Sequence, residues 1–102
     1  MNYSRQLSAY NTDTIIFRSV VIELKLNQAV SLRLQELLRE RSMTQYQLFT
    51  KSGVPKSTIS SLTNCTYESV KLRIIHELCQ GLSISITEFF KSPLFDEDNL
   101  DP

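Results

Sequence analysis

A short stretch of polar residues has a spacing that would place several hydrogen-bonding side chains on one helix face. Four of them recur at helical spacing and share one face of a helix that we expect over residues 56–63: Lys56, Ser57, Ser60 and Ser61. A lysine ammonium donates hydrogen bonds, and a serine hydroxyl is short and can donate or accept. No acidic residue lies on this face. The face is therefore suited to a partner that is rich in hydrogen-bond acceptors and negative charge.

The other reactive side chains do not form a catalytic or metal-binding set. Cys65 and Cys79 are isolated thiols without metal-ligand spacing, which is typical of free cysteines in a reducing cytoplasm. His76 is the only histidine and has no cysteine or carboxylate cluster near it in the sequence. We therefore expect no catalytic residues, no metal, no cofactor and no small-molecule substrate, and a cytoplasmic protein without membrane association.

A lone glycine divides the region that carries these residues. Thr44 and Gln47 fit a capping box, in which a hydroxyl and an amide three residues apart satisfy the first N–H groups of a helix. Gly53 can take the positive φ of a helix exit, and Pro55 is well suited to the next helix start. Two helices of about eight residues joined by such a turn form a helix-turn-helix, which we place at residues 44–63.

Helical patterns flank this unit on both sides. We expect Asn27 to cap the first helix and Ser69 to cap the fourth, while Ser85 and Glu88 form a second capping box for a short fifth helix that runs through Phe90. The apolar residues expected to face the core are Val30, Leu34, Leu37, Leu38, Leu48, Phe49, Ile59, Leu62, Leu72, Ile75, Leu78, Cys79 and Leu82.

The N-terminal residues have a different pattern. Residues 1–13 are polar and without periodicity, which is typical of a mobile tail, whereas apolar and other residues alternate from Val20 to Leu26 as in a β-strand. One strand needs a partner. The segment could pair with a second copy, pack on the domain, be a disordered lead-in, or be an artefact of an early start codon.

Charge is segregated along the 102 residues although the net charge is zero. Residues 21–92 carry nine basic and six acidic side chains, and residues 93–102 carry four acidic ones. A mildly basic body permits nucleic-acid binding without demanding it. We expect the acidic end, "FDEDNLDP", to be a disordered, solubilising tail. It could also repel DNA non-specifically.

Three stretches, in order, resemble the Xre-type helix-turn-helix family, the Cro and phage-repressor class of bacterial DNA-binding domains. They are "LRLQELLRERSMTQYQL", "SGVPKSTIS" and "LCQGLSISITEFF", and the resemblance covers about residues 32–90. It implies that helix 56–63 enters the major groove of duplex DNA, where base edges present donors and acceptors. It also implies a homodimer.

The resemblance assigns roles to individual positions. Gln45 matches a phosphate-contacting residue that often supports the reading helix. Thr44, the residue before Gln45, is the N-cap of the same helix, where backbone N–H groups also suit a phosphate. The positions matching base-reading residues are Lys56, Ser57, Ser60 and Ser61, with Thr58 at a site of mixed use and Asn64, just past the helix, at a backbone-contact position.

The sequence also departs from the family pattern. The family commonly has an arginine and a glutamate, as a buried ion pair, where Leu38 and Thr63 stand here. Losing both partners together leaves no charge stranded. Phe49 replaces the usual alanine, which predicts a wider helix crossing and puts the pose of Lys56 in question. Cys65 replaces the usual glycine, so the following loop is expected to take another path.

These observations predict an all-α, five-helix domain of the phage-repressor type over residues 27–92, with an N-terminal extension at 1–26 and an acidic tail at 93–102. The expected function is sequence-specific DNA binding by a small transcriptional regulator, a repressor. The alternatives are an antitoxin-type component, or a helix-turn-helix that only binds a partner protein. Near-zero net charge and the bulky Phe49 favour the last of these slightly.

Overall fold

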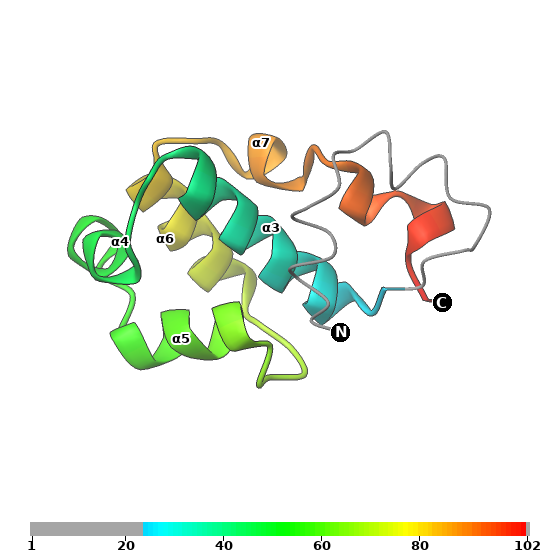
Figure 1. The fold of residues 1–102 in the computed structure, drawn as a ribbon, viewed down its shortest axis with the longest axis horizontal. Coiled ribbons are helices and arrows are strands. Elements are labelled where there is room, and N and C mark those ends of the chain that lie inside the picture. The colour runs from blue at the N-terminus through cyan, green and yellow to red at the C-terminus, as the bar shows by residue number, and fades with distance from the viewer. Residues whose placement is uncertain (1–23, 102) are drawn as a thin grey trace.

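The described chain is all-α and consists of short helices joined by tight turns. The computed structural model describes residues 24–101. Five α-helices follow one another: α3 (Leu26–Glu40), α4 (Gln45–Ser52), α5 (Lys56–Asn64), α6 (Leu72–Leu82) and α7 (Ile86–Phe90). Two 3₁₀ turns, η1 (Pro93–Phe95) and η2 (Glu97–Asn99), complete the described chain (Figure 1). The predicted fold class is therefore confirmed.

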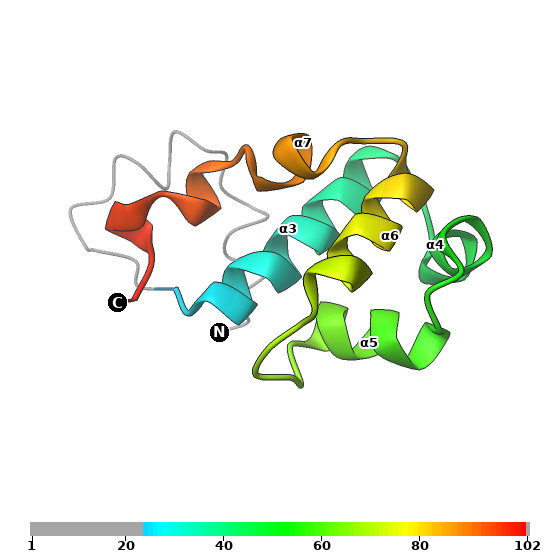
Figure 2. The same cartoon turned by 180° about the vertical axis from the view of Figure 1, so that it is seen from behind.

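One hydrophobic core holds the helices together. α4 packs mainly on α6, and α5 packs mainly on α3. Seen from behind, α3 and α6 follow a similar slant across the molecule, with α4 at one end and α5 below them (Figure 2). The buried core residues are Val30, Leu34, Leu37, Leu38, Leu48, Val54, Ile59, Leu62, Ile75, Leu78, Cys79, Leu82 and Phe89. Most of the inward positions predicted from periodicity are therefore confirmed.

The helix-turn-helix forms as its local sequence predicts. The Thr44 hydroxyl accepts from the Gln47 N–H at 3.0 Å, and the Gln47 side chain accepts from the Thr44 N–H at 2.9 Å. Gly53 ends α4 with φ of 76°, in the left-handed region that glycine reaches at least cost. Val54 then turns inward and is 1% exposed, which anchors the turn to the core.

Two predicted helix starts were wrong. Lys25, not Asn27, is the N-cap of α3, because the Gln28 side chain accepts from the Lys25 N–H. Asn27 instead lies in the first turn and donates its amide to the Tyr67 carbonyl at 2.7 Å. Lys71, not Ser69, is the N-cap of α6. Tyr67 and Val70 pack against the core, so the chain between α5 and α6 stays non-helical for longer than its sequence suggests.

The inward facing predicted for two apolar residues also needs correction. Leu72 is 72% exposed, because it opens α6 at a point beyond the edge of the core. Phe49 is only partly buried and packs against the rim of the core. Of the capping box predicted for α7, the hydroxyl half is confirmed, since the Ser85 hydroxyl accepts from the Glu88 N–H at 3.0 Å.

A second, smaller core joins the two ends of the described chain. It contains Leu24, Ala29, Leu32 and Leu94, with Leu100 against its edge. Leu24 forms an isolated parallel β-bridge with Leu100: its N–H donates to the Asn99 carbonyl at 2.8 Å, and its carbonyl accepts from the Asp101 N–H at 2.7 Å. Residues 93–101 are thus part of the fold, and the prediction of a disordered acidic end was wrong for them. The few apolar residues of this acidic segment pack against Leu24 and α3, and its acidic composition does not predict that packing.

The structure describes only the last three positions of the strand predicted at residues 20–26. Leu24 pairs in extended conformation, but Leu26 already belongs to α3, so the strand does not extend that far. Positions 20–23, the predicted mobile tail at 1–13 and Pro102 lie outside the described residues.

Tyr67 ties the loop after α5 to the start of α3, and its removal should change the alkaline stability of the protein. Its hydroxyl donates to the Asn27 carbonyl at 2.9 Å. Burial, the larger cause, and the nearby Cys65 thiolate raise the pKa of Tyr67 well above its ordinary value of 10.0. Above pH 10 the unfolded tyrosine loses its proton while the folded one keeps it, so the fold loses stability as pH rises. Tyr67→Phe should cost about 1 kcal/mol at pH 7.

The same variant should weaken the alkaline loss. We expect urea unfolding at pH 8 and pH 11 to show a smaller drop for Tyr67→Phe than for the wild type. Tyr46→Phe is the matched control, since Tyr46 is exposed. Equal drops in wild type and Tyr67→Phe would contradict the role of this hydroxyl.

Candidate nucleic-acid interface

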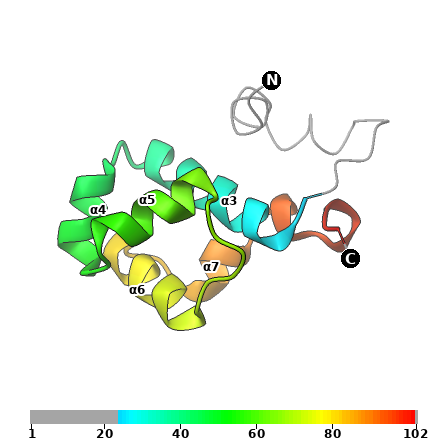
Figure 3. The same ribbon diagram turned by 90° about the horizontal axis from the view of Figure 1, so that it is seen from below.

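Helix α5 presents the predicted polar face on one side of the molecule. Viewed from below, α5 forms the near face, with α4 at one end and the loop to α6 at the other (Figure 3). Lys56 and Ser57 are exposed, whereas Ser60 and Ser61 are half-buried. No acidic residue occurs anywhere in α5. The exposed part of the predicted face is therefore concentrated in the first turn of the helix.

The far end of α5 differs slightly from the prediction. Asn64 is the last residue of the helix rather than a residue just past it. Its amide donates to the Ser60 hydroxyl at 3.3 Å, and both residues remain on the outer side. Thr58 is half-buried, in keeping with a residue of mixed structural and contact use.

One open depression lies between the start of α4 and the end of α5. It has a volume of about 460 Å³, and its lining includes Thr44, Gln45 and Asn64. In the first turn of α4 the capping box occupies the N–H groups of Thr44 and Gln47. Helix geometry leaves the N–H groups of Gln45 and Tyr46 directed outward from this end. Such donors, with the positive end of the helix dipole, suit a phosphate oxygen.

Gln45 also connects α4 to α5. Its amide donates to the Thr63 hydroxyl at 3.0 Å, and that hydroxyl donates to the Ser60 carbonyl at 3.1 Å. From α3, the Ser31 hydroxyl and the Gln35 amide donate to the Thr63 carbonyl at 3.0 and 2.7 Å. A network of neutral groups thus holds the end of α5, where the family pattern has an ion pair. Its polar atoms are mutually satisfied, so no buried charge needs compensation.

A second depression lies on the opposite flank of α5. It has a volume of about 410 Å³ and is lined by Ser57, Thr58 and Ser61 on one side and by Lys71 and Arg73 on the other. Both cations are exposed. Sequence reasoning did not single them out, although two basic residues two positions apart at a helix start were a usable signal. The fold brings them beside α5 by way of the loop that Tyr67 anchors.

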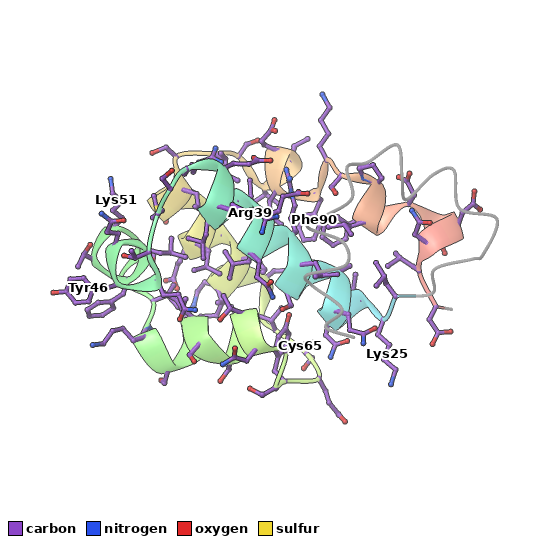
Figure 4. The ribbon with its side chains drawn as sticks, in the orientation of Figure 1. Lys25, Arg39, Tyr46, Lys51, Cys65 and Phe90 are labelled. Carbon is purple, nitrogen blue, oxygen red and sulfur yellow. The ribbon has the colours of Figure 1, made fainter. Side chains whose placement is uncertain are left out.

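Lys56 leans toward α4 rather than standing alone. Its ammonium nitrogen lies 5.4 Å from the centre of the Tyr46 ring and 5.8 Å from the centre of the Phe49 ring. Figure 4 shows Tyr46 on the part of α4 that is near α5, and Lys51 extending from α4 in another direction. The pose of Lys56, which the sequence had left in question, thus places its ammonium beside both rings, with Tyr46 the nearer. Tyr46 therefore lies near the interface, beside Lys56.

The loop after α5 keeps the conformation that a glycine would favour. Cys65 has φ of 55° and ψ of 45°, in the left-handed region, and its N–H donates to the carbonyl of Leu62 at 3.3 Å. The expectation that this cysteine sends the loop along another path was therefore wrong at its first residue. This left-handed conformation costs a non-glycine residue of order 1 kcal/mol. Burial raises the pKa of the Cys65 thiol, which makes its nucleophilic thiolate scarcer.

The remaining candidate chemistry is sparse in residues 24–101. His76 is exposed, and this part of the chain contains no group of three histidine, cysteine, aspartate or glutamate residues that could hold a metal. Within the same residues no helix is long and apolar enough to cross a membrane.

Two solved structures are similar to most of this chain. The wild-type restriction-modification controller protein C.Esp1396I is 26% identical, with a TM-score of 0.62 over 68% of this chain and 88% of that chain. The crystal structure of prophage Lp1 protein 11 is 27% identical, with a TM-score of 0.63 over 72% of this chain and 99% of that chain. No curated protein matches the sequence.

A family model covers most of the helical region. The model of the Cro/C1-type HTH DNA-binding domain matches residues 33–93, which include the helix-turn-helix, α6 and α7. The matched region is more than half of the chain. It contains every residue that lines the two depressions beside α5. The chain belongs to the Cro/C1-type helix-turn-helix DNA-binding family.

Proposed function

We propose that this protein binds specific duplex DNA sites by placing α5 in the major groove, and that it acts as a small bacterial transcriptional repressor in the cytoplasm. The observation that carries the proposal is the acid-free face of α5 between two open depressions lined by hydroxyls, amides and two cations. A major groove of B-DNA admits one helix, and the phosphates on its two rims would lie beside the two depressions. The role is one of binding rather than catalysis.

The side chains divide into those that read bases and those that hold the backbone. Lys56 and Ser57 are exposed in the first turn of α5 and are assigned to base edges, where lysine donates to guanine O6 and N7. Ser60 and Ser61 are assigned to later positions of the same face, with Thr58 beside them. Backbone phosphates are assigned to Thr44, Gln45 and Asn64, which line the first depression.

A homodimer is the expected binding form. One recognition helix buries little surface, and proteins of this architecture bind two half-sites about one helical turn apart. An apolar hollow of about 170 Å³ supports self-association; its lining includes Leu26, Val70, Leu72 and Phe90. Leu26 and Leu72 are 59% and 72% exposed, which is unfavourable unless another surface covers them.

Lys56→Ala should weaken binding to the preferred site by about 1–3 kcal/mol and relax the choice of one base. The expected loss is sequence-dependent, because a lysine that donates to a guanine distinguishes it from the other bases. The measurement is fluorescence anisotropy with the preferred duplex and with duplexes substituted at each position of one half-site.

Gln45→Ala is the matched contrast for Lys56→Ala. It should weaken binding to every duplex by a similar factor, since a phosphate contact carries no sequence information. Lys56→Ala lowering the affinity for all duplexes equally would mean that Lys56 contacts only phosphate. A sequence-selective loss for Gln45→Ala would overturn its assignment to the backbone.

A second candidate is a component that binds a partner protein in addition to DNA, as an antitoxin does, or in place of DNA. The net charge of zero and the apolar hollow favour it. The similarity to a restriction-modification controller and to a prophage protein supports the regulator role over this second candidate. The neighbouring genes discriminate between these roles, because an antitoxin is encoded beside its toxin.

A further inference from the structure

Three side chains from two helices form a small cluster at the start of α5. The rings of Tyr46 and Phe49 are one helical turn apart on α4, with centres 5.9 Å apart and planes tilted by 55°. The Lys56 ammonium lies within 6 Å of both ring centres. Phe49 is half-buried, but Tyr46 is 60% exposed, which leaves one side of the cluster open to solvent.

This geometry has a direct physical consequence for the lysine. A cation near the face of an aromatic ring is attracted by the ring quadrupole. A free lysine side chain samples many rotamers, and binding to DNA must restrict them. Contact with two rings restricts those rotamers before DNA arrives, so less conformational entropy is lost on binding.

We propose that Tyr46 and Phe49 are positioning residues that hold the Lys56 ammonium at the α4 end of the recognition helix and thereby strengthen its contact with DNA. The inference rests on the proposed function, in which Lys56 contacts DNA. It adds that this contact depends on aromatic rings from the other helix of the helix-turn-helix. Tyr46 acts through its ring, so its hydroxyl is not required.

The free protein provides the first test, which does not depend on DNA. Protons held near the face of an aromatic ring resonate upfield, so the ε-methylene protons of Lys56 should lie upfield of those of Lys51. Tyr46→Leu should reduce this shift, and Tyr46→Phe should retain it. Equal ε-methylene shifts for Lys56 and Lys51 in the wild type would overturn the cluster.

The second test is a double-mutant cycle measured by anisotropy on the preferred duplex. Tyr46→Leu should weaken binding roughly two- to fivefold when Lys56 is present. It should have no effect in a Lys56→Met background, where the charge is absent but the side chain keeps a similar shape. Tyr46→Phe should bind as the wild type does. Tyr46 is mostly exposed, so its variants should fold, and an unchanged urea midpoint checks this.

The outcomes separate this inference from the proposed function. If Lys56→Met weakens binding but Tyr46→Leu weakens it equally in both backgrounds, Tyr46 contacts DNA directly, and the positioning role is wrong while the proposed function stands. Loss of binding in Tyr46→Phe would likewise assign the effect to the hydroxyl. If Lys56→Met has no effect on any duplex, the DNA-contact role of Lys56 is wrong, and the positioning role falls with it.

Discussion

Arg33→Ala is expected to lower the free energy of unfolding by about 3 kcal/mol, because it leaves the buried Phe89 carbonyl without a donor and leaves the Glu88 carbonyl with the Lys91 N–H alone. Arg33 is 6% exposed, and its guanidinium donates to the Phe89 carbonyl at 2.7 Å and to the Glu88 carbonyl at 2.8 Å. These carbonyls belong to the last turn of a five-residue helix, which has little stability of its own. Urea unfolding followed by circular dichroism measures the loss.

Variants of Arg33 and of Glu36 distinguish the donor geometry of the guanidinium from the effect of its charge. Arg33→Lys should recover only part of the stability, because a single ammonium cannot match a guanidinium that donates from separate nitrogens. Glu36→Gln is the control: Glu36 accepts from Arg33 at 2.6 Å but its side chain is 34% exposed, so its loss should cost less than about 1 kcal/mol. Full recovery by Arg33→Lys would contradict the capping role.

Gly81→Ala should destabilise the fold by about 1–3 kcal/mol and weaken DNA binding as well. A Cβ at Gly81 would lie 2.7 Å from the Ser52 Cβ and 3.0 Å from the Ser52 nitrogen. Both atoms are fixed to the last residue of α4, so the helix itself must shift. In a helix interior, alanine is normally more stabilising than glycine by about 1 kcal/mol, but the clash with Ser52 outweighs that gain. Urea unfolding and anisotropy on one duplex measure the two effects.

Gly53→Ala is the matched control for this clash. Apart from the adjoining residues, no heavy atom lies within 4 Å of a Cβ at Gly53, so its cost comes from the positive φ of 76°. Because α4 leads directly into α5, a displaced Ser52 should also move the recognition helix. If Gly81→Ala were as stable as the wild type, the close approach of α4 and α6 would not be a constraint on the fold.

The sequence predicted the helix-turn-helix well because its signals are local. A capping box at Thr44 and Gln47, and a glycine at position 53, specify their conformations through neighbouring residues alone. The polar face of α5 follows from spacing within one helix. These parts needed no knowledge of distant contacts.

The errors fall where distant residues decide the structure. Asn27 serves as a link to Tyr67, forty positions away, and not as a cap. The tail is ordered because Leu94 and Leu100 meet Leu24 and α3, which composition cannot reveal.

The candidate site was incomplete for the same reason. Lys71 and Arg73 come beside Ser57 only through the folded loop, and Tyr46 reaches Lys56 across the turn between α4 and α5. Buried Arg33 was not predicted either, since its partners lie in α7. Each of these features requires the relative placement of two helices.

Sequence-specific DNA binding is tested most directly by fluorescence anisotropy on a labelled duplex from the protein's own upstream region. A scrambled duplex of the same composition is the control, and both are titrated at low and moderate salt. Specific readout by α5 predicts tight binding to the native duplex, with the scrambled duplex losing affinity steeply as salt rises. Equal, weak binding to both duplexes, abolished by moderate salt, would contradict the proposal that α5 reads bases.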